Sequence, residues 1–393
     1  MGREHERIRG ASPHAKRRRA TAPKAPPMGL ARLVALQRSA GNSAVAARLQ
    51  RKIGWSGGGK LNQGERDTAG TQVTRIPVEG VPEGRAPGRA IIAVPHGGKA
   101  PDTVDILFHL HGWHLWFAGA GYAEHGSEVD DKSVYRIEQQ LDSLATGGRA
   151  LIAVLPQGPL GRHLEKKERE NVSQFGRDDA SVDVPAYITH ALELAKERWP
   201  YAPQPKQGRV ILSGHSGAGE PLSTMFDSSV AHDKNAKKHS LLPDRPKLEA
   251  FISFDTINGP GQYASHRAFL IEQLERDLKA ATAAAAGDTG PAGIAAARAD
   301  LDANGFRFRA VYSHGYASWY DHPKDAKGEK LGLKQAFDDW LATRKLPPEL
   351  EAAFRRNYTF TPAGVEHMEM IGGVKDGGGR RAEHLKDALA SIP

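Results

Sequence analysis

A serine among small residues, at the end of a short apolar stretch, is the strongest chemical signal in this sequence. Residues 210–220 read Val-Ile-Leu-Ser-Gly-His-Ser-Gly-Ala-Gly-Glu, and segment 214–218 lacks only a final Gly to match Gly-x-Ser-x-Gly. In that motif a strand ends in a tight turn that raises the serine hydroxyl above the edge of a sheet, where it can act as a nucleophile. Ala218 is small enough to replace the last Gly. We therefore predict that Ser216 is a nucleophile, with a strand before it and a helix opening near Pro221.

A serine hydroxyl attacks a carbonyl only when a base removes its proton, so a histidine is needed nearby. His367 lies directly after the last predicted strand and before the last predicted helix, and we favour it as the base. His314, which follows the strand ending at Tyr312, is the competitor. His384 fits the solvated face of the terminal helix.

The histidine in turn needs a carboxylate that orients its ring. Asp255 ends a predicted strand directly and precedes a turn signal, so we prefer it as the acid. Asp321 follows the next predicted strand after an intervening loop and is the alternative. Two glutamates next to the base in sequence also stay open, Glu366 and Glu369.

The negative oxygen that develops during acyl transfer needs preorganised main-chain donors. Gly217, the residue after the nucleophile, is expected to supply one N–H group. The second is expected from the loop His111-Gly112-Trp113, which follows a predicted strand, with the Trp113 amide preferred to that of Gly112.

Metal and cofactor sites are less well supported by the sequence. The run 109–114 places histidines on alternate positions of a strand, which share one face, but it lacks the carboxylate of a His-x-His-x-Asp-His site. No Gly-Lys-Ser/Thr follows the strand before Ser216, as a phosphate loop would require. The chain has no cysteine, which excludes disulfides, thiol nucleophiles and thiolate metal ligands. We expect neither a metal nor a cofactor.

The net charge of +8 comes from the start of the chain. Residues 1–60 contain 14 Lys and Arg against 2 Asp and Glu, a formal charge of +12, which leaves −4 for the rest. Residues 1–27 have almost no large apolar side chains and are predicted to be a disordered basic arm. Because the arm has no interleaved aromatic residues, nucleic-acid binding is not favoured. The arginine-rich run 16–19 is followed by polar, proline-rich sequence, so a secretory signal peptide is not expected. No transmembrane segment is expected either, because the longest apolar runs, such as 150–155, are too short to cross a bilayer.

The remaining sequence divides into three parts. Helical spacing of apolar residues predicts a short helical leader over 28–52, and a linker or surface extension is expected over 53–84. Strands and helices alternate over 85–393, which predicts a mostly parallel twisted sheet with helices on both faces. The stretch 280–297, rich in Ala and Gly, is expected to be a frayed helix end and a surface insertion. The predicted strands cover 90–94, 105–110, 150–155, 210–212, 248–254, 306–312 and 358–361, and the predicted helices cover 134–144, 184–199, 264–286, 333–341 and 381–392.

The elbow at Ser216, the His-Gly loop at 111–112, the order of elements and the late His367 resemble the α/β-hydrolase family, over about residues 85–393. The resemblance implies an esterase-like or lipase-like serine hydrolase that works through Ser216, His367 and Asp255 and an acyl-enzyme. A serine peptidase or amidase acting on cell-wall material, and a non-catalytic binding protein that keeps the fold, are the alternatives.

The segment 36–51, from Leu36-Gln37-Arg38-Ser39-Ala40-Gly41-Asn42-Ser43 to Leu49-Gln50-Arg51, resembles the leader of proteins encoded with bacterial extracellular contractile injection systems. The resemblance implies a toxin-like effector that is cytoplasmic in the producing cell, loaded into a particle through residues 28–52, and delivered to a target cell. Its substrate would then be an ester, in lipid or cell-wall material.

Overall fold

The computed structural model of the chain describes most of the residues between 71 and 392. All described residues belong to one compact unit, Lys52–Pro393. The expected disordered arm at 1–27, the helical leader at 28–52 and the first part of the expected linker lie outside the described residues. The described residues are 71–77, 89–95, 102–112, 115–118, 121–124, 137, 140, 144, 151–156, 182, 184–198, 204–234, 240–244, 247–321, 332–367, 370–371 and 384–392.

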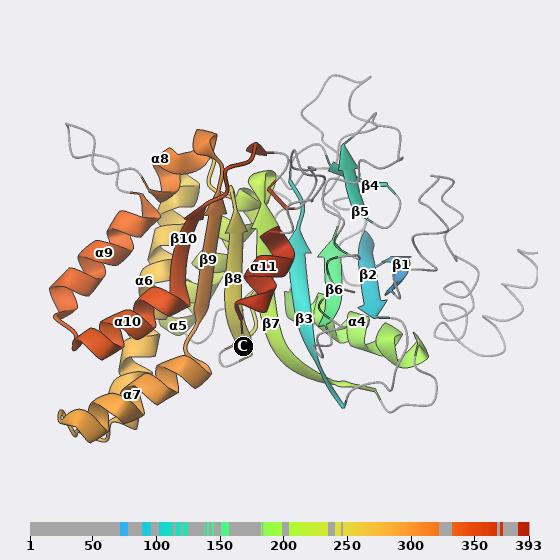
Figure 1. The fold of residues 1–393 in the computed structure, drawn as a ribbon. Coiled ribbons are helices and arrows are strands. Elements are labelled where there is room, and N and C mark those ends of the chain that lie inside the picture. Colours follow the sequence, from blue (N-terminus) through green and yellow to red (C-terminus); the bar gives the residue numbers. More distant parts are fainter. Residues whose placement is uncertain are drawn as a thin grey trace, which may run out of the picture. The chain divides into compact units, whose positions relative to one another are not determined.

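An eight-stranded sheet forms the centre of this unit (Figure 1), with the strand order β1-β2-β6-β3-β7-β8-β9-β10. The β1–β2 and β2–β6 pairs are antiparallel, whereas the pairs from β6 through β3, β7, β8 and β9 to β10 are parallel. Two short strands, β4 (Leu115–Ala118) and β5 (Gly121–Glu124), pair with each other outside this sheet. The strands of the main sheet are β1 (Thr71–Pro77), β2 (Arg89–Pro95), β3 (Thr103–Leu110), β6 (Leu151–Pro156), β7 (Lys206–His215), β8 (Leu248–Phe254), β9 (Arg307–Tyr312) and β10 (Tyr358–Pro362).

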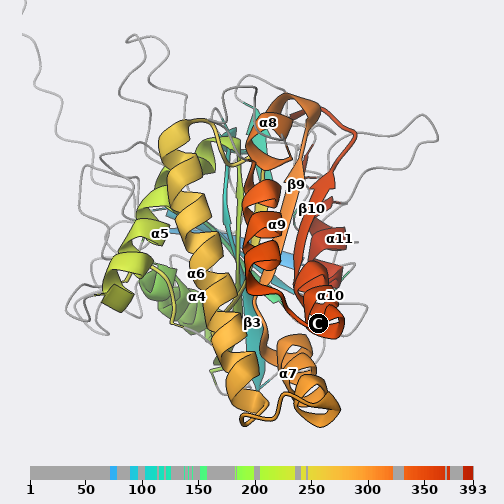
Figure 2. The same ribbon diagram turned by 90° about the vertical axis from the view of Figure 1, so that its left-hand side faces the viewer.

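Helices cover both faces of the sheet, as Figures 1 and 2 show. On one face lie α4 (Val184–Arg198), α5 (Gly219–Lys234) and α6 (Pro260–Ala284), and on the other lies α11 (His384–Ala390). Side chains of β3 alternate between the two layers: Ile106 and Phe108 pack with α4 to α6, and Leu107 packs with α11. Every residue of β6 and β8 is buried, as expected for parallel strands covered on both sides. The predicted fold class, a mostly parallel sheet with helices on both faces, is confirmed.

The carboxyl ends of the central strands lie at one edge of the sheet. Leu110 at the end of β3 pairs with Gly214 in β7, Gly214 pairs with Ser253 in β8, and Phe254 pairs with Val311 in β9. Because parallel strands joined by crossovers end on the same side, the segments that follow them meet there. The candidate site residues follow these ends.

The predicted strands correspond to β2, β3, β6, β7, β8, β9 and β10. Five predicted helices, including the one expected to open near Pro221, correspond to α4, α5, α6, α9 (Leu333–Arg344) and α11. Of the remaining predicted helix, over 134–144, the structure describes three residues, all of them helical. Several elements had no sequence prediction. They include the edge strand β1, which lies within the expected linker, the short strands β4 and β5, and the helices α7 (Pro291–Asn304), α8 (Ala317–Tyr320) and α10 (Pro348–Asn357). No helix in the described part of the chain combines the length and apolar character needed to cross a membrane.

The expectation for 280–297 was wrong. This stretch contains the end of α6, a turn, and the first half of α7 (Pro291–Asn304), and Ala281 and Ala297 are buried. The Asp288 carboxylate accepts hydrogen bonds from the main-chain nitrogens of Gly290 (2.7 Å) and Gly293 (2.9 Å) and so satisfies the start of α7. The small side chains form a helical hairpin here and not a frayed end.

Candidate active site

The turn after β7 has the geometry of a nucleophile elbow. Ser216 has a φ of 50° and begins a 3-10 helix, Ser216–Ala218, that leads into α5. A side chain at Gly214 or at Gly219 would collide with its surroundings. A Cβ at Gly214 would lie 2.7 Å from Leu222 Cδ1, and a Cβ at Gly219 would lie 2.0 Å from the main-chain oxygen of Thr256. Ala218 is fully buried, so a methyl group fits where the motif usually has its last glycine.

The structure brings Ser216, His367 and Asp255 together. His367 Nε2 lies 2.7 Å from Ser216 Oγ, and His367 Nδ1 lies 2.8 Å from Asp255 Oδ2. These residues come from the ends of β7 and β8 and from the segment after β10, so they are far apart in sequence. With a neutral imidazole, Nδ1–H donates to the carboxylate, and Nε2 accepts from the serine hydroxyl. This is the arrangement in which a histidine can take the serine proton.

The carboxylate of Asp255 is held in place by the end of the neighbouring strand. Asp255 is fully buried and has a φ of 51°. Ser313, the residue after β9, donates from its main-chain nitrogen to Oδ1 (2.9 Å) and from its hydroxyl to Oδ2 (2.6 Å). A buried carboxylate needs such donors to remain charged. Ser313 was not among the site residues predicted from the sequence, although its position directly after a predicted strand was a usable signal.

A polar network fixes the turn that carries Asp255. The main-chain nitrogen of Thr256 donates to the Tyr320 hydroxyl (2.8 Å), which also lies 2.7 Å from Ser253 Oγ. On the other side, Asn258 Nδ2 donates to the main-chain oxygen of Ser216 (2.8 Å). These bonds connect the acid turn directly to the elbow.

The alternative candidates for the acid and the base are not part of this chain of contacts. Asp321 accepts a hydrogen bond from the Tyr312 hydroxyl (3.1 Å) and lies 3.7 Å from Lys334 Nζ. His314 is exposed at the start of the 3-10 helix His314–Tyr316, and Glu366 is exposed. His384 belongs to α11, and Glu369 lies outside the described residues.

Of the three residues considered for the oxyanion site, the structure describes two. Gly217 is in the first turn of the helix after the elbow, where main-chain N–H groups have no partner within the helix. Gly112 is buried and lies two residues after Leu110, the last residue of β3, which pairs with Gly214 of β7. Trp113 lies outside the described residues.

Three buried histidines pack beneath this site. Burial lowers the pKa of His109 to about 3 and that of His111 to about 4, and it also lowers the pKa of His215. Each makes a short contact as a neutral ring: His109 Nδ1 with Ser213 Oγ (2.9 Å), His111 Nδ1 with the Gly112 oxygen (2.6 Å), and His215 Nε2 with the His367 oxygen (2.9 Å). Among the described residues, no three His, Asp or Glu side chains are placed to hold a metal ion.

A tyrosine that was not predicted as a site residue lies against the imidazole. The Tyr316 ring stacks on the His367 ring, with the centroids 4.3 Å apart and the planes at 10°. Its hydroxyl is 3.4 Å from His367 Nε2. The only available sequence signal was its place shortly after a predicted strand.

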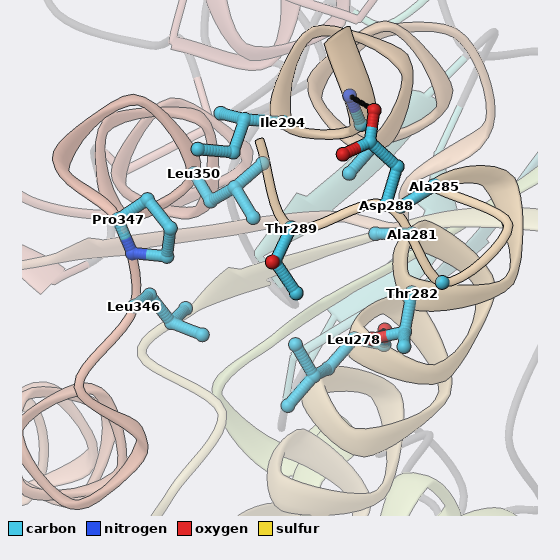
Figure 3. Close-up of a pocket in the computed structure, with 13 residues that line it drawn as sticks. Leu278, Ala281, Thr282, Ala285, Asp288, Thr289, Ile294, Leu346, Pro347 and Leu350 are labelled. Carbon is cyan, nitrogen blue, oxygen red and sulfur yellow. Dashed lines mark hydrogen bonds between the residues drawn. The ribbon is translucent and has the colours of Figure 1, made fainter. Parts of the chain in front are cut away.

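An apolar cavity of about 230 Å³ lies far from these residues (Figure 3). Leu278 on α6, Ile294 on α7 and Leu350 on α10 line it, together with the loop at Leu346 and Pro347. α6 begins beside the acid turn, and at 1.5 Å per residue its cavity-lining end lies roughly 30 Å away. The cavity is therefore separate from the candidate site.

Comparisons with known proteins give weak structural likenesses only. No model of a protein family matches this chain, and no curated protein sequence does either. Among solved structures, it is similar to the feruloyl esterase module from Clostridium thermocellum, with a TM-score of 0.40, 11% identity, and coverage of 82% of this chain and 88% of that one. It is also similar to esterase B from Lactobacillus rhamnosis (TM-score 0.29, 12% identity, 86% and 84%) and to siderophore hydrolase EstB from Aspergillus nidulans (TM-score 0.31, 13% identity, 77% and 91%).

Proposed function

We propose that this chain is a serine hydrolase that cleaves carboxylic esters through an acyl-enzyme. The observation that carries the proposal is the continuous chain of contacts from Ser216 Oγ through the His367 ring to Asp255, with distances of 2.7 and 2.8 Å. Such a chain turns an unreactive hydroxyl into a nucleophile by giving its proton a place to go. Ser313 holds the Asp255 carboxylate in this chain of contacts through two hydrogen bonds.

In the first half of the reaction, Ser216 Oγ attacks the ester carbonyl while its proton moves to His367 Nε2. Asp255 stabilises the imidazolium through the bond to Nδ1 and does not itself take the proton. Main-chain N–H groups of Gly217 and of the 112–113 loop are the proposed donors to the oxyanion. The tetrahedral species then collapses: the bond to the leaving oxygen breaks, and Nε2 gives that oxygen its proton.

In the second half, water takes the place of the leaving alcohol. His367 Nε2 removes a proton from the water as the water attacks the acyl carbon, and the bond to Ser216 Oγ breaks. The serine recovers its proton from the imidazolium, and the carboxylic acid leaves.

A binding protein that had lost its chemistry would have no reason to keep a buried acid hydrogen-bonded to a histidine that contacts a serine. Burying a carboxylate is costly unless it has partners, so the Asp255 arrangement favours an enzyme over a binding protein. A peptidase or amidase would use the same three residues, and the identity of the leaving group separates it from an esterase. Within the ester class, the lipid and cell-wall substrates implied by the leader resemblance remain part of the proposal.

The test uses the full chain and its Ser216→Ala variant with a fluorophosphonate probe, nitrophenyl esters of increasing acyl length, and matched anilides. We expect wild-type labelling and ester turnover, and losses of at least about ten-thousand-fold in the variant. Anilide turnover comparable to ester turnover would make the amidase the better assignment. Well-folded wild type that neither binds the probe nor turns over any substrate would overturn the hydrolase proposal.

We further propose that residues 28–52 load the chain into a contractile injection particle. The support is the sequence of segment 36–51 alone. Deleting residues 1–52 should abolish co-purification with the particle and leave ester hydrolysis intact. Unchanged loading of the shortened chain would remove the loading role without affecting the proposed chemistry.

A further inference from the structure

Tyr316 is placed to act on the reacting atoms. It ends the 3-10 helix His314–Tyr316, directly after β9, and is partly buried. Its hydroxyl lies 3.4 Å from His367 Nε2, and it is near enough to the Ser216 hydroxyl for the two to interact. The hydroxyl is therefore next to both atoms between which the catalytic proton moves.

The position of the ring is fixed by the local fold. The main-chain nitrogen of Tyr316 donates to the Ser313 oxygen (3.1 Å), which closes the short turn after β9. The same turn supplies the Ser313 donors to Asp255. In this short segment Ser313 holds the Asp255 carboxylate, and the Tyr316 ring covers one face of the His367 imidazole. The stacked arrangement places the Tyr316 hydroxyl near Nε2 of that ring.

The space around this hydroxyl is where the leaving oxygen of an ester must come. To receive the proton, that oxygen has to approach within hydrogen-bond distance of Nε2. Negative charge grows on it as its bond to the acyl carbon breaks, and an O–H donor at that place stabilises the charge. Burial and the nearby Asp255 raise the pKa of Tyr316, so its hydroxyl keeps its proton at neutral pH.

We propose that the Tyr316 hydroxyl is a catalytic hydrogen-bond donor to the leaving-group oxygen during acylation and to the incoming water during deacylation. The inference rests on the proposed esterase function. Tyr316 keeps its own proton throughout: the proton that the leaving oxygen receives comes from His367 Nε2, and the tyrosine contributes only a hydrogen bond. Its effect should therefore depend on how much charge the leaving oxygen carries.

The test compares Tyr316→Phe with wild type on esters of one acid whose leaving groups range from ethanol through trifluoroethanol and phenol to p-nitrophenol. The value of kcat/KM reports acylation. We expect it to fall about 10- to 100-fold for the ethyl ester, the range of one hydrogen bond to a charged group. For p-nitrophenolate, which needs little stabilisation, the fall should be less than about threefold. The phenylalanine keeps the stacked ring, so the acid and base stay in place.

Tyr312→Phe is the matched control, because it removes a tyrosine hydroxyl from the same segment but one that donates to Asp321. It should show the wild-type dependence on the leaving group. An equal loss for all leaving groups in Tyr316→Phe would assign the residue a structural role and overturn the inference. No loss at all would also overturn it, while leaving the proposed function intact if wild type still reacts with the fluorophosphonate. A wild type without labelling or turnover would reject both proposals.

Discussion

Ser313, at the end of β9, binds the carboxylate of Asp255, at the end of β8, with both its main-chain nitrogen and its hydroxyl. The strand β9 thus supplies two donors to the carboxylate that follows the neighbouring strand β8. The two strands run side by side in parallel, with Phe254 paired to Val311, so the end of one lies next to the end of the other.

Removing the Ser313 hydroxyl should weaken catalysis without abolishing it. In Ser313→Ala the main-chain donor to Asp255 remains, but a hydrogen bond to a charged group is lost, which is worth about 1.5–3 kcal/mol. We expect kcat on a nitrophenyl ester to fall about tenfold or more. Ser228→Ala is the control, because that hydroxyl also makes two hydrogen bonds, to Met225 and Leu241, on a helix away from the site. Equal kcat values for the two variants would contradict this role.

Neutralising each candidate carboxylate in turn shows whether Asp255 or Asp321 is the catalytic acid. Asp255→Asn keeps the size of the side chain, and Asn tolerates the φ of 51°. It removes the charge that holds the imidazole in the reactive tautomer, so kcat should fall about a thousand- to ten-thousand-fold. Asp321→Asn should change kcat less than about threefold, because its contacts are with Tyr312 and Lys334. The reverse ranking would assign the acid to Asp321.

The fold was readable from the sequence because the buried strands are short apolar runs that end in turn signals. β1 was not recognised, since an edge strand carries polar residues and resembles a linker. The hairpin of α6 and α7 was also missed: Ala and Gly suggested low complexity and outweighed the start signal Asp288-Thr289-Gly290-Pro291. In this stretch the capping residue Asp288 indicates the start of the helix better than the composition does.

Those residues of the candidate site that directly follow a predicted strand could be predicted from the sequence. Ser216, Asp255 and His367 were chosen in that way, and the structure places them in contact. Ser313 and Tyr316 also follow a strand, but nothing in the local sequence tells which residue of a turn faces a neighbour 51 or 58 positions away. Such pairs are determined by the register between strands, which a single sequence does not encode locally.

His215 should position the base through the main chain. Its Nε2–H donates to the His367 oxygen (2.9 Å), and the two rings lie 4.7 Å apart. His215→Phe keeps a ring of similar size and leaves that oxygen without this donor, so the loop carrying His367 should loosen. We expect kcat to fall about tenfold with little change in KM, as for an interaction that aligns the reacting groups. His109→Phe, which replaces a buried imidazole bonded to Ser213 Oγ by a ring without a polar atom, should reduce stability and leave kcat within about threefold.

Close packing at the elbow predicts a strong effect of a single methyl group. In Gly219→Ala the new Cβ would lie 2.0 Å from the Thr256 main-chain oxygen, so either the elbow or the acid turn must move. The free energy of unfolding should decrease by about 1–3 kcal/mol, with a loss of activity, because overpacking shifts backbone. Gly261→Ala is the matched control at the start of α6, where a Cβ meets no atom within 4 Å. Its stability should stay within about 1 kcal/mol of wild type. Urea unfolding at pH 8 measures both, and equal stability of the two variants would contradict the close approach.

Buried neutral histidines should make the protein sensitive to acid well before its carboxylates titrate. Burial lowers the pKa of His109 to about 3 and those of His111 and His266 to about 4, from 6.5. The unfolded chain binds protons at these rings below pH 6.5, whereas the folded chain does so only near pH 3–4. The folded state is therefore fully favoured above pH 6.5 and loses stability as the pH falls from there toward 4.

Each of these rings should contribute a slope of up to about 1.4 kcal/mol per pH unit to the free energy of unfolding. Urea titrations between pH 7.5 and 4.5 measure that slope. His266 is a suitable ring to remove, because its nitrogens contact the Thr256 hydroxyl (3.0 Å) and the Gln262 oxygen (2.8 Å) and neither Ser216 nor His367. His266→Gln should reduce this slope by the contribution of about one bound proton. Substitution of the exposed His314 by Gln should leave the slope unchanged. If stability is flat over this range, these rings are not buried in their neutral form.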